Sequence, residues 1–166
     1  MVAAAVRITE ADLALAAVRI RRRQQATTPP PDDWAGWIAA VFPGYLWPPY
    51  ASYHVAFWQW VWSIEAGTPA RPFVAIWPRG FAKSTSTEVA AAMLAARGKR
   101  RYALYVCATQ DQADTHVKNV AGMLESPAFA RHFPATSKRK LGKYGNSDGW
   151  RRNRLRTSDG FTLDAI

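Results

Sequence analysis

The apolar residues of this 166-residue chain form two short continuous runs, each followed by a stretch that favours a helix. Residues 73–77 and 102–108 are rich in strand-forming side chains, and near-continuous apolar runs are typical of strands in a parallel sheet that is covered on both faces. Residues 83–96 and the segment after Thr109 have the composition of helices. The order strand, helix, strand, helix predicts a right-handed, parallel βαβα unit.

Residues that interrupt the apolar runs mark the ends of these elements. Pro78 and Gly80 end the first strand, and Arg97 with Gly98 stops the first helix. Residues 109–112 form a capping box for the second helix. The buried face of that second helix is expected to consist of Ala113, Val117, Val120 and Leu124.

The N-terminal part is predicted to be a lead that precedes the main domain. A helix starts at Glu10 behind a capping box, and residues 27–33 have the composition of a linker. We therefore separate a helical lead at residues 1–33 from a domain at residues 34–166. Within that domain, the aromatic and proline-rich residues 34–49 are expected to form an irregular cover.

Aromatic side chains recur at helical spacing between Pro49 and Gly67, which predicts a well-buried helix with those two residues at its ends. His54 lies on this aromatic stripe. No second histidine, cysteine or acid stands near it at metal-ligand spacing. We expect His54 to be a buried histidine with satisfied hydrogen bonds rather than a metal ligand.

The C-terminal part is predicted to contain a basic loop and a hairpin. Residues 126–133 favour a short helical turn, residues 135–152 have the composition of an exposed loop, and residues 154–166 resemble a hairpin with Asp-Gly in its turn. Such a loop can grip a phosphate backbone or stay solvated. Its candidate DNA-binding residues are Lys138, Arg139, Lys140, Lys143, Arg151 and Arg152.

Composition narrows the classes of partner. The net charge of +10 favours a polyanion, with nucleic acid ahead of membrane, although many basic domains bind no specific partner. No apolar run approaches the length of a transmembrane helix. The single cysteine, Cys107, excludes an internal disulfide, suits a reducing compartment and is expected to belong to the core.

The segment between the first strand and its helix is the strongest candidate for chemistry. A phosphate-binding loop follows the pattern G-x-x-x-x-G-K-[ST], and here Trp77 and Ala82 stand at the two glycine positions before Lys83. Lys83 would reach the β- and γ-phosphates, and the Ser84 hydroxyl would ligate Mg²⁺. The alternative is an ordinary turn between a strand and a helix. The candidate nucleotide-binding residues are Pro78, Arg79, Gly80, Phe81, Ala82, Lys83, Ser84 and Thr85.

A hydrolase with such a loop also needs a carboxylate at the end of a later strand to hold Mg²⁺ and orient water. Asp164 follows only a short, interrupted apolar run, so we do not assign it this role. No Ser-His-Asp order, HExxH pattern or cysteine–histidine cluster suggests another chemistry. The sequence therefore predicts half of an ATP site.

Two segments together resemble a known family. Residues 77–85 (Trp-Pro-Arg-Gly-Phe-Ala-Lys-Ser-Thr) and 105–113 (Tyr-Val-Cys-Ala-Thr-Gln-Asp-Gln-Ala) are similar to the large subunit of the terminase of tailed bacteriophages. The upstream Tyr53-His54 helix and residues 149–166 are similar as well, so the likeness covers about residues 40–166.

The resemblance implies the N-terminal part of an ATP-driven motor that packages double-stranded DNA into procapsids. It implies an incomplete P-loop NTPase-type α/β fold, a parallel sheet flanked by helices, with ATP and Mg²⁺ as cofactors. Lys83 would be the phosphate lysine, Ser84 the Mg²⁺ ligand and Arg79 a catalytic arginine at the γ-phosphate.

The same resemblance implies Walker B acids, a coupling motif and nuclease carboxylates beyond Ile166. It also implies a portal protein, a small terminase subunit and a homo-oligomeric ring as partners, in the cytoplasm of an infected bacterium and with no membrane. By itself this chain is expected to hydrolyse ATP negligibly. Two alternatives stay open: another P-loop enzyme, such as a helicase-like ATPase or small-molecule kinase, and a non-enzymatic basic adaptor with a decayed loop.

Overall fold

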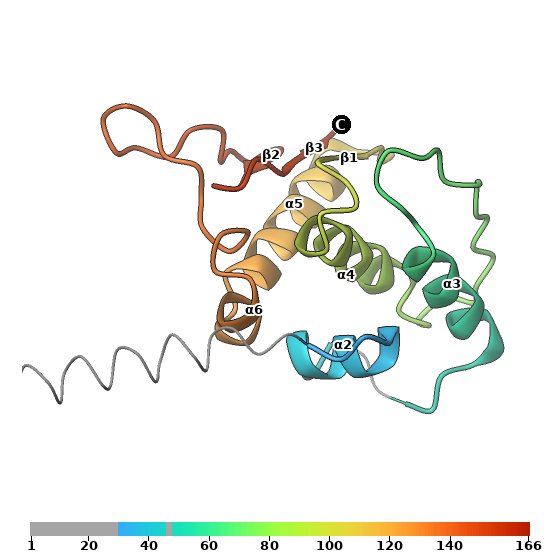
Figure 1. The fold of residues 1–166 in the computed structure, drawn as a ribbon. Helices are drawn as coiled ribbons and strands as arrows, with labels where there is room; N and C mark the ends of the chain where they lie inside the picture. The colour runs from blue at the N-terminus through green and yellow to red at the C-terminus, as the bar shows by residue number, and fades with distance from the viewer. Residues whose placement is uncertain (1–29, 46–47) are drawn as a thin grey trace, which may run out of the picture.

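The computed structural model describes residues 30–45 and 48–166, and Figure 1 shows their arrangement. The lead helix predicted from Glu10 and residues 27–29 of the linker lie outside these residues. The elements are, in order, α2 (Trp34–Val41), α3 (Ser52–Trp62), α4 (Lys83–Ala96), β1 (Tyr102–Tyr105), α5 (Gln110–Leu124), α6 (Pro127–His132), β2 (Arg154–Arg156) and β3 (Thr162–Ala165).

The three strands form one small mixed sheet in the order β1-β3-β2. Strand β1 runs parallel to β3, with Tyr102 opposite Thr162, whereas β2 and β3 form an antiparallel hairpin. The hairpin turn is closed by Thr157, whose N–H donates to the Phe161 carbonyl at 2.9 Å, and Gly160 in this turn has a φ of 95°. The predicted C-terminal hairpin is confirmed.

One face of the sheet is covered by α5, beside which α4 packs (Figure 1). Leu155, Leu163 and Ala165 are fully buried on the covered face. Tyr102 and Leu104 of β1 are 54% and 48% exposed, so the opposite face is largely bare at this edge. The described residues thus form a mixed α/β layer structure with one covered sheet face. None of their helices is long and apolar enough to span a bilayer.

The prediction of a strand at residues 73–77 is wrong for the described structure. Phe73 and Trp77 pack against Phe57 of α3, with ring centroids 5.6 and 5.5 Å away, while Val74 and Ile76 are 80% and 88% exposed. The segment has the alternating burial of a strand, but it pairs with no strand among residues 30–45 and 48–166. A strand is defined by hydrogen bonds to a neighbour, so side-chain pattern without a neighbour leaves an extended, unpaired segment.

The bounds of several other elements also differ from those predicted from the sequence. Residues 34–41 form a helix rather than an irregular cover, because the Asp33 carboxylate caps its first turn by accepting from the Gly36 N–H at 2.7 Å. Helix α3 ends at Trp62, five residues before Gly67, and β1 is shorter than the predicted strand. The bounds of α4 match the prediction, and Thr109 caps α5 as expected.

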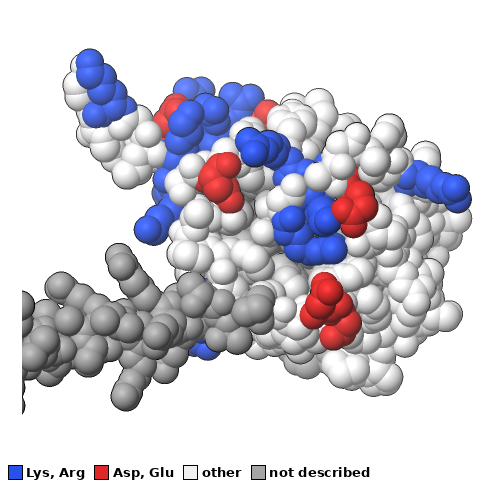
Figure 2. Space-filling view, viewed as in Figure 1, with Lys and Arg blue, Asp and Glu red and all other residues white. Residues whose placement is uncertain are grey.

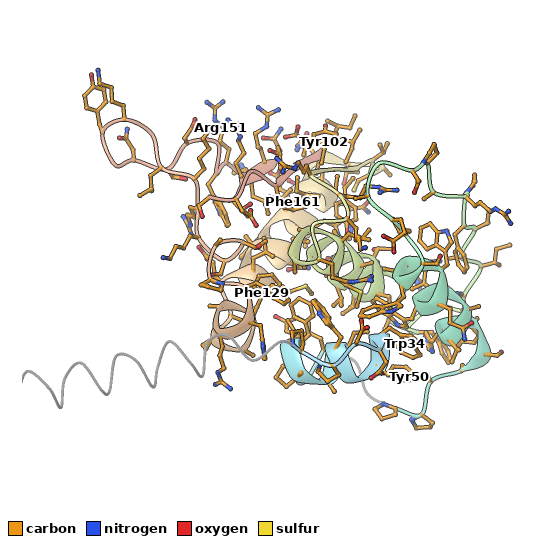
Figure 3. All side chains as sticks on the ribbon, viewed as in Figure 1. Trp34, Tyr50, Tyr102, Phe129, Arg151 and Phe161 are labelled. Carbon is orange, nitrogen blue, oxygen red and sulfur yellow. The ribbon has the colours of Figure 1, made fainter. Side chains whose placement is uncertain are left out.

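Helices α2, α3 and α6 share an aromatic core below α4 and α5. Phe42 stacks on Phe129 with centroids 5.5 Å apart, and Trp37 lies 5.7 Å from Phe133. Figure 3 shows Phe129 between α6 and α2, and Trp34 beside Tyr50. Rings of this size each remove a large apolar area from water, so these contacts supply much of the stability of this half of the molecule.

A buried carboxylate joins α4 to α5. Glu88 is only 4% exposed, and its Oε1 lies 2.7 Å from His116 Nδ1 and accepts from the Asn119 amide at 2.9 Å. The His116 ring in turn stacks on Tyr105 of β1, with centroids 5.1 Å apart. Polar groups removed from water must be paired, so this cluster fixes the register of the two helices.

We predict that Glu88→Ala lowers the free energy of unfolding by about 2–3 kcal/mol, because the hydrogen bonds of a buried carboxylate to His116 and Asn119 are lost. Urea denaturation measures the change. Glu125→Ala is the matched control: Glu125 pairs with Arg139 at the surface, and its loss should cost no more than about 1 kcal/mol. Equal costs for the two substitutions would contradict a structural role for the buried carboxylate.

Candidate functional site

Residues 78–85 comprise the loop that follows the extended segment and the first turn of α4. It surrounds an open hollow of ≈ 570 Å³ that is lined by residues 77–85. Lys83 and Ser84 are exposed, as are Arg79 and Gly80, whereas Trp77 behind them is buried. The structure therefore brings the sequence-predicted nucleotide-binding residues together around one concave surface of the size that small ligands occupy.

The backbone of this loop has unusual hydrogen-bonding capacity. Going along the chain from Arg79, the first backbone N–H with an acceptor is that of Ser86, which donates to the Ala82 carbonyl at 2.8 Å. In the described structure, none of the N–H groups of residues 79–85 has an acceptor, and no side chain caps α4. Seven consecutive free amides and the positive end of a helix dipole are suited to an anion. No acidic residue lines the hollow.

Ala82 takes a left-handed conformation at the N-cap of α4, with φ 56° and ψ 25°. Among the described residues it alone has a positive φ without being a glycine. The sequence pattern expects glycine at this position, and the structure supplies the reason. A Cβ in this region of φ and ψ costs about 1 kcal/mol relative to glycine.

His54 of α3 contacts the loop, which the sequence did not predict. Its Nδ1 accepts from the Ala51 N–H at 3.3 Å, and its Nε2 lies 3.1 Å from the Phe81 carbonyl oxygen. A carbonyl can only accept, so Nε2 carries the proton and donates. The expectation of satisfied hydrogen bonds is confirmed, but His54 is only half-buried and not buried as expected. The contact with Ala51 could have been predicted, because a side chain at the third helical position can reach back to the N-cap residue.

The His54 contact has a consequence for the amide next to it. In a trans peptide the carbonyl and the following N–H point in opposite directions. Because the Phe81 carbonyl points to His54, the Ala82 N–H points away from α3. His54 thereby orients one of the free amides of the loop.

Asp164, which was given no role in holding Mg²⁺ on sequence grounds, is bound by Arg154 and Tyr102. Its carboxylate accepts from Arg154, including an Nη2 contact at 2.9 Å, and from the Tyr102 hydroxyl at 3.2 Å. The Arg154 hydrogen bond lowers the pKa of Asp164 and keeps it ionised. Across residues 30–45 and 48–166, no three histidine, cysteine or acidic side chains group as metal ligands.

The candidate DNA-binding cations lie on a loop at the side of the molecule opposite α3 (Figures 1 and 2). Three of them are paired with carboxylates: Arg139 with Glu125 at 2.6 Å, Lys140 with Asp148 at 3.3 Å and Arg152 with Asp114 at 3.0 Å. The other three have no acidic partner among the described residues: Lys138, Lys143 and Arg151. The six are therefore unequal as phosphate ligands, which the sequence could not show.

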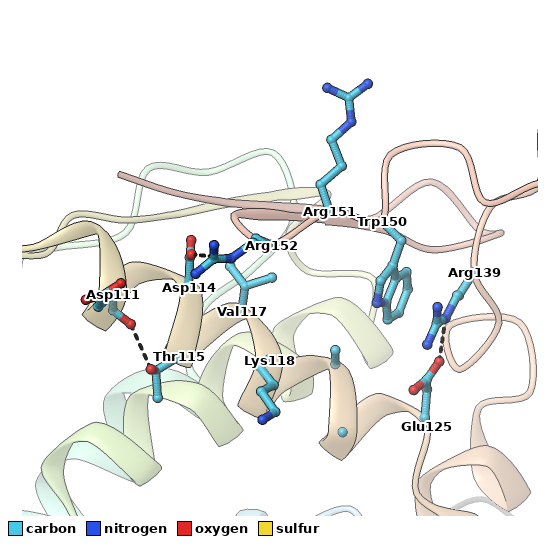
Figure 4. Close-up of a pocket in the computed structure, with 12 residues that line it drawn as sticks. Asp111, Asp114, Thr115, Val117, Lys118, Glu125, Arg139, Trp150, Arg151 and Arg152 are labelled. Atoms are coloured by element: carbon cyan, nitrogen blue, oxygen red, sulfur yellow. Dashed lines mark hydrogen bonds and ion pairs between the residues drawn. The ribbon is translucent and has the colours of Figure 1, made fainter.

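A second hollow, of ≈ 790 Å³, lies between α5 and this loop. Figure 4 shows Trp150 facing Arg139, whose guanidinium lies 4.7 Å from the ring centroid, while Arg151 points away. Its walls carry both acidic and basic side chains, so it lacks the uniform charge of a phosphate site.

Comparison of the chain with protein-family models, curated proteins and solved structures gives no match.

We predict that Ala82→Gly raises the free energy of unfolding by about 0.5–1 kcal/mol, because glycine adopts the left-handed conformation without strain. The larger entropy of the unfolded chain that glycine brings offsets only part of this gain. Ala91→Gly, in the interior of the same helix, should instead lower it by about 1 kcal/mol. Denaturant titration reports both. A loss of stability at both positions would show that Ala82 is not strained.

We further predict that His54→Ala lowers the free energy of unfolding by about 1–2 kcal/mol, because two hydrogen bonds are lost. His54→Gln should cost less than half as much, since a glutamine amide can accept from Ala51 and donate to Phe81. Nitrogen NMR of the wild-type imidazole should show the proton on Nε2. Equal losses for Ala and Gln, or a proton on Nδ1, would contradict the assignment.

Proposed function

We propose that the chain is the N-terminal part of the ATPase domain of a terminase large subunit, and that residues 78–85 bind the triphosphate of ATP. The observation that carries this proposal is the run of free amides around an exposed lysine at the start of α4. The resemblance of residues 77–85 and 105–113 to that family supplies the choice among phosphate-binding proteins.

Three side chains of the loop have roles that their chemistry supports. Lys83, at the first position of α4, offers a mobile ammonium to the β- and γ-phosphates. Ser84 offers a hydroxyl to Mg²⁺, and Arg79 offers a guanidinium to the γ-phosphate oxygens. The metal, when bound, would neutralise phosphate charge.

Binding and hydrolysis are separable in this chain. The hollow is lined without a carboxylate, and Asp164 is held by Arg154 and Tyr102. Water therefore lacks a positioned base or metal-bound acid in the described part of the chain, and we expect ATP to be held without turnover. The motor activity on double-stranded DNA, the ring, and the portal and small-subunit partners in the host cytoplasm belong to the proposal for the whole protein.

Two alternatives fit the same loop. Another P-loop enzyme would bind nucleotide equally well, and a basic adaptor with a decayed loop would not bind it. The free amides favour binding over decay.

We predict that calorimetric titration detects Mg-ATP binding to the chain and that Lys83→Ala weakens it about 10- to 100-fold, as expected for a charge-assisted contact. Lys99→Ala is the matched control, because Lys99 is paired with Glu65 at 2.5 Å and lies outside the loop. Absence of binding by the wild type would overturn the proposal in favour of the adaptor. Steady-state ATP turnover that depends on Lys83 would contradict the expected absence of hydrolysis.

A further inference from the structure

Residues 139–149 form an ordered arm rather than a shapeless loop. At its base the Asp148 N–H donates to the Lys140 carbonyl at 2.8 Å, and the Lys140 N–H donates to the Arg156 carbonyl at 2.9 Å. At its tip the Gly142 N–H donates to the Asn146 carbonyl at 2.8 Å. Figure 1 shows the arm projecting from the body beside β2.

The base of the arm is held against the sheet. A Cβ at Gly149, whose φ is 89°, would lie 2.4 Å from Arg156 Cδ, so only glycine allows this approach. Lys140 and Arg156 both contact the Asp148 carboxylate, at 3.3 and 3.5 Å. The direction of the arm is therefore set by its base.

The tip carries an aromatic ring and a cation with nothing to pack on. Tyr144 is 84% exposed, Leu141 is 63% exposed, and the Lys143 ammonium lies 5.7 Å from the Tyr144 ring centroid. Residues 141–147 contain no acid. The packing of the chain gives no reason for an exposed aromatic residue at this point.

Cations without acidic partners continue from the tip to the base. Lys138 and Arg151 flank the arm, and Trp150 at its base presents a second aromatic ring in the hollow beside α5. Figure 2 shows lysine and arginine gathered over this region. A row of cations with rings at intervals fits a chain of phosphates and bases.

We propose that residues 138–152 bind single-stranded nucleic acid, with Tyr144 stacked on an unpaired base and Lys138, Lys143 and Arg151 at phosphates. A paired base within a duplex has both faces covered by its neighbours, so a ring that stacks selects unpaired or unstacked bases. A lipid surface is the weaker candidate, because two apolar side chains bury little area in a bilayer and the mixed charges beside Trp150 serve base edges better than acyl chains. The proposal does not depend on the triphosphate site.

The test uses the whole 166-residue chain and an oligonucleotide that contains 2-aminopurine, single-stranded or annealed to its complement. The wild type should bind the single strand more tightly and change the 2-aminopurine fluorescence. Tyr144→Ala should weaken single-strand binding roughly tenfold and abolish that change, without altering the dependence on salt. Tyr144→Phe should stay within about twofold of the wild type. Because Tyr144 is exposed, both variants should melt like the wild type.

Lys143→Gln separates charge from stacking. It should reduce the slope of log affinity against log salt by about 0.7, as expected for one phosphate contact to a single strand, and leave the fluorescence change intact. Lys83→Ala should change neither quantity, so failure of the ATP proposal and failure of this one are distinguishable.

Three results would overturn the proposal. One is no binding to the single strand, and another is equal affinity of Tyr144→Ala and the wild type. The third is Tyr144-dependent binding to vesicles that contain phosphatidylglycerol in place of the oligonucleotide, which would identify the arm as a lipid-surface anchor.

Discussion

Helix α3 contacts the α4 segment near both of its ends, and the geometry of the loop at residues 78–85 depends on this arrangement. At one end His54 donates to the Phe81 carbonyl. At the other end the Arg97 guanidinium lies 3.7 Å from the Trp62 ring centroid and donates to the Trp62 carbonyl at 3.2 Å. A helix that is held at two points cannot slide or rotate without breaking one of them, so the direction of its N-terminal amides is set by packing as well as by the backbone.

The two regions of interest lie on different sides of the molecule but share α5. Glu88 of α4 contacts His116 on α5, and α5 in turn carries Asp114 and Glu125, which pair with Arg152 and Arg139 of the basic loop. These contacts connect α4, which begins within residues 78–85, to the basic loop through α5. Packed contacts of this kind can carry coupling between two sites, while coupling itself is a free energy that only binding measurements reveal.

Ion pairing reduces the number of cations that are available to bind a polyanion. The chain has a net charge of +10, yet half of the six cations first considered for DNA contacts already have carboxylate partners. Exposed pairs of this kind contribute little stability. Among these six cations, those without a carboxylate partner are Lys143 at the tip and Lys138 and Arg151 beside the base of the arm.

Local sequence determined what depends on neighbours along the chain: the bounds of α4, the cap of α5 at Thr109, the hairpin around Gly160 and the grouping of residues 78–85. Local sequence did not determine strand pairing. Residues 73–77 have strand-forming side chains but pair with no strand among the described residues, while β1 pairs with β3, which is distant in sequence. Only tertiary structure decided that His54 reaches Phe81, 27 positions later, and that Glu88 meets His116. Hydrogen bonds between residues far apart in sequence depend on how the helices pack, and hydrophobic periodicity indicates which face of a helix is buried without indicating which residue it meets there.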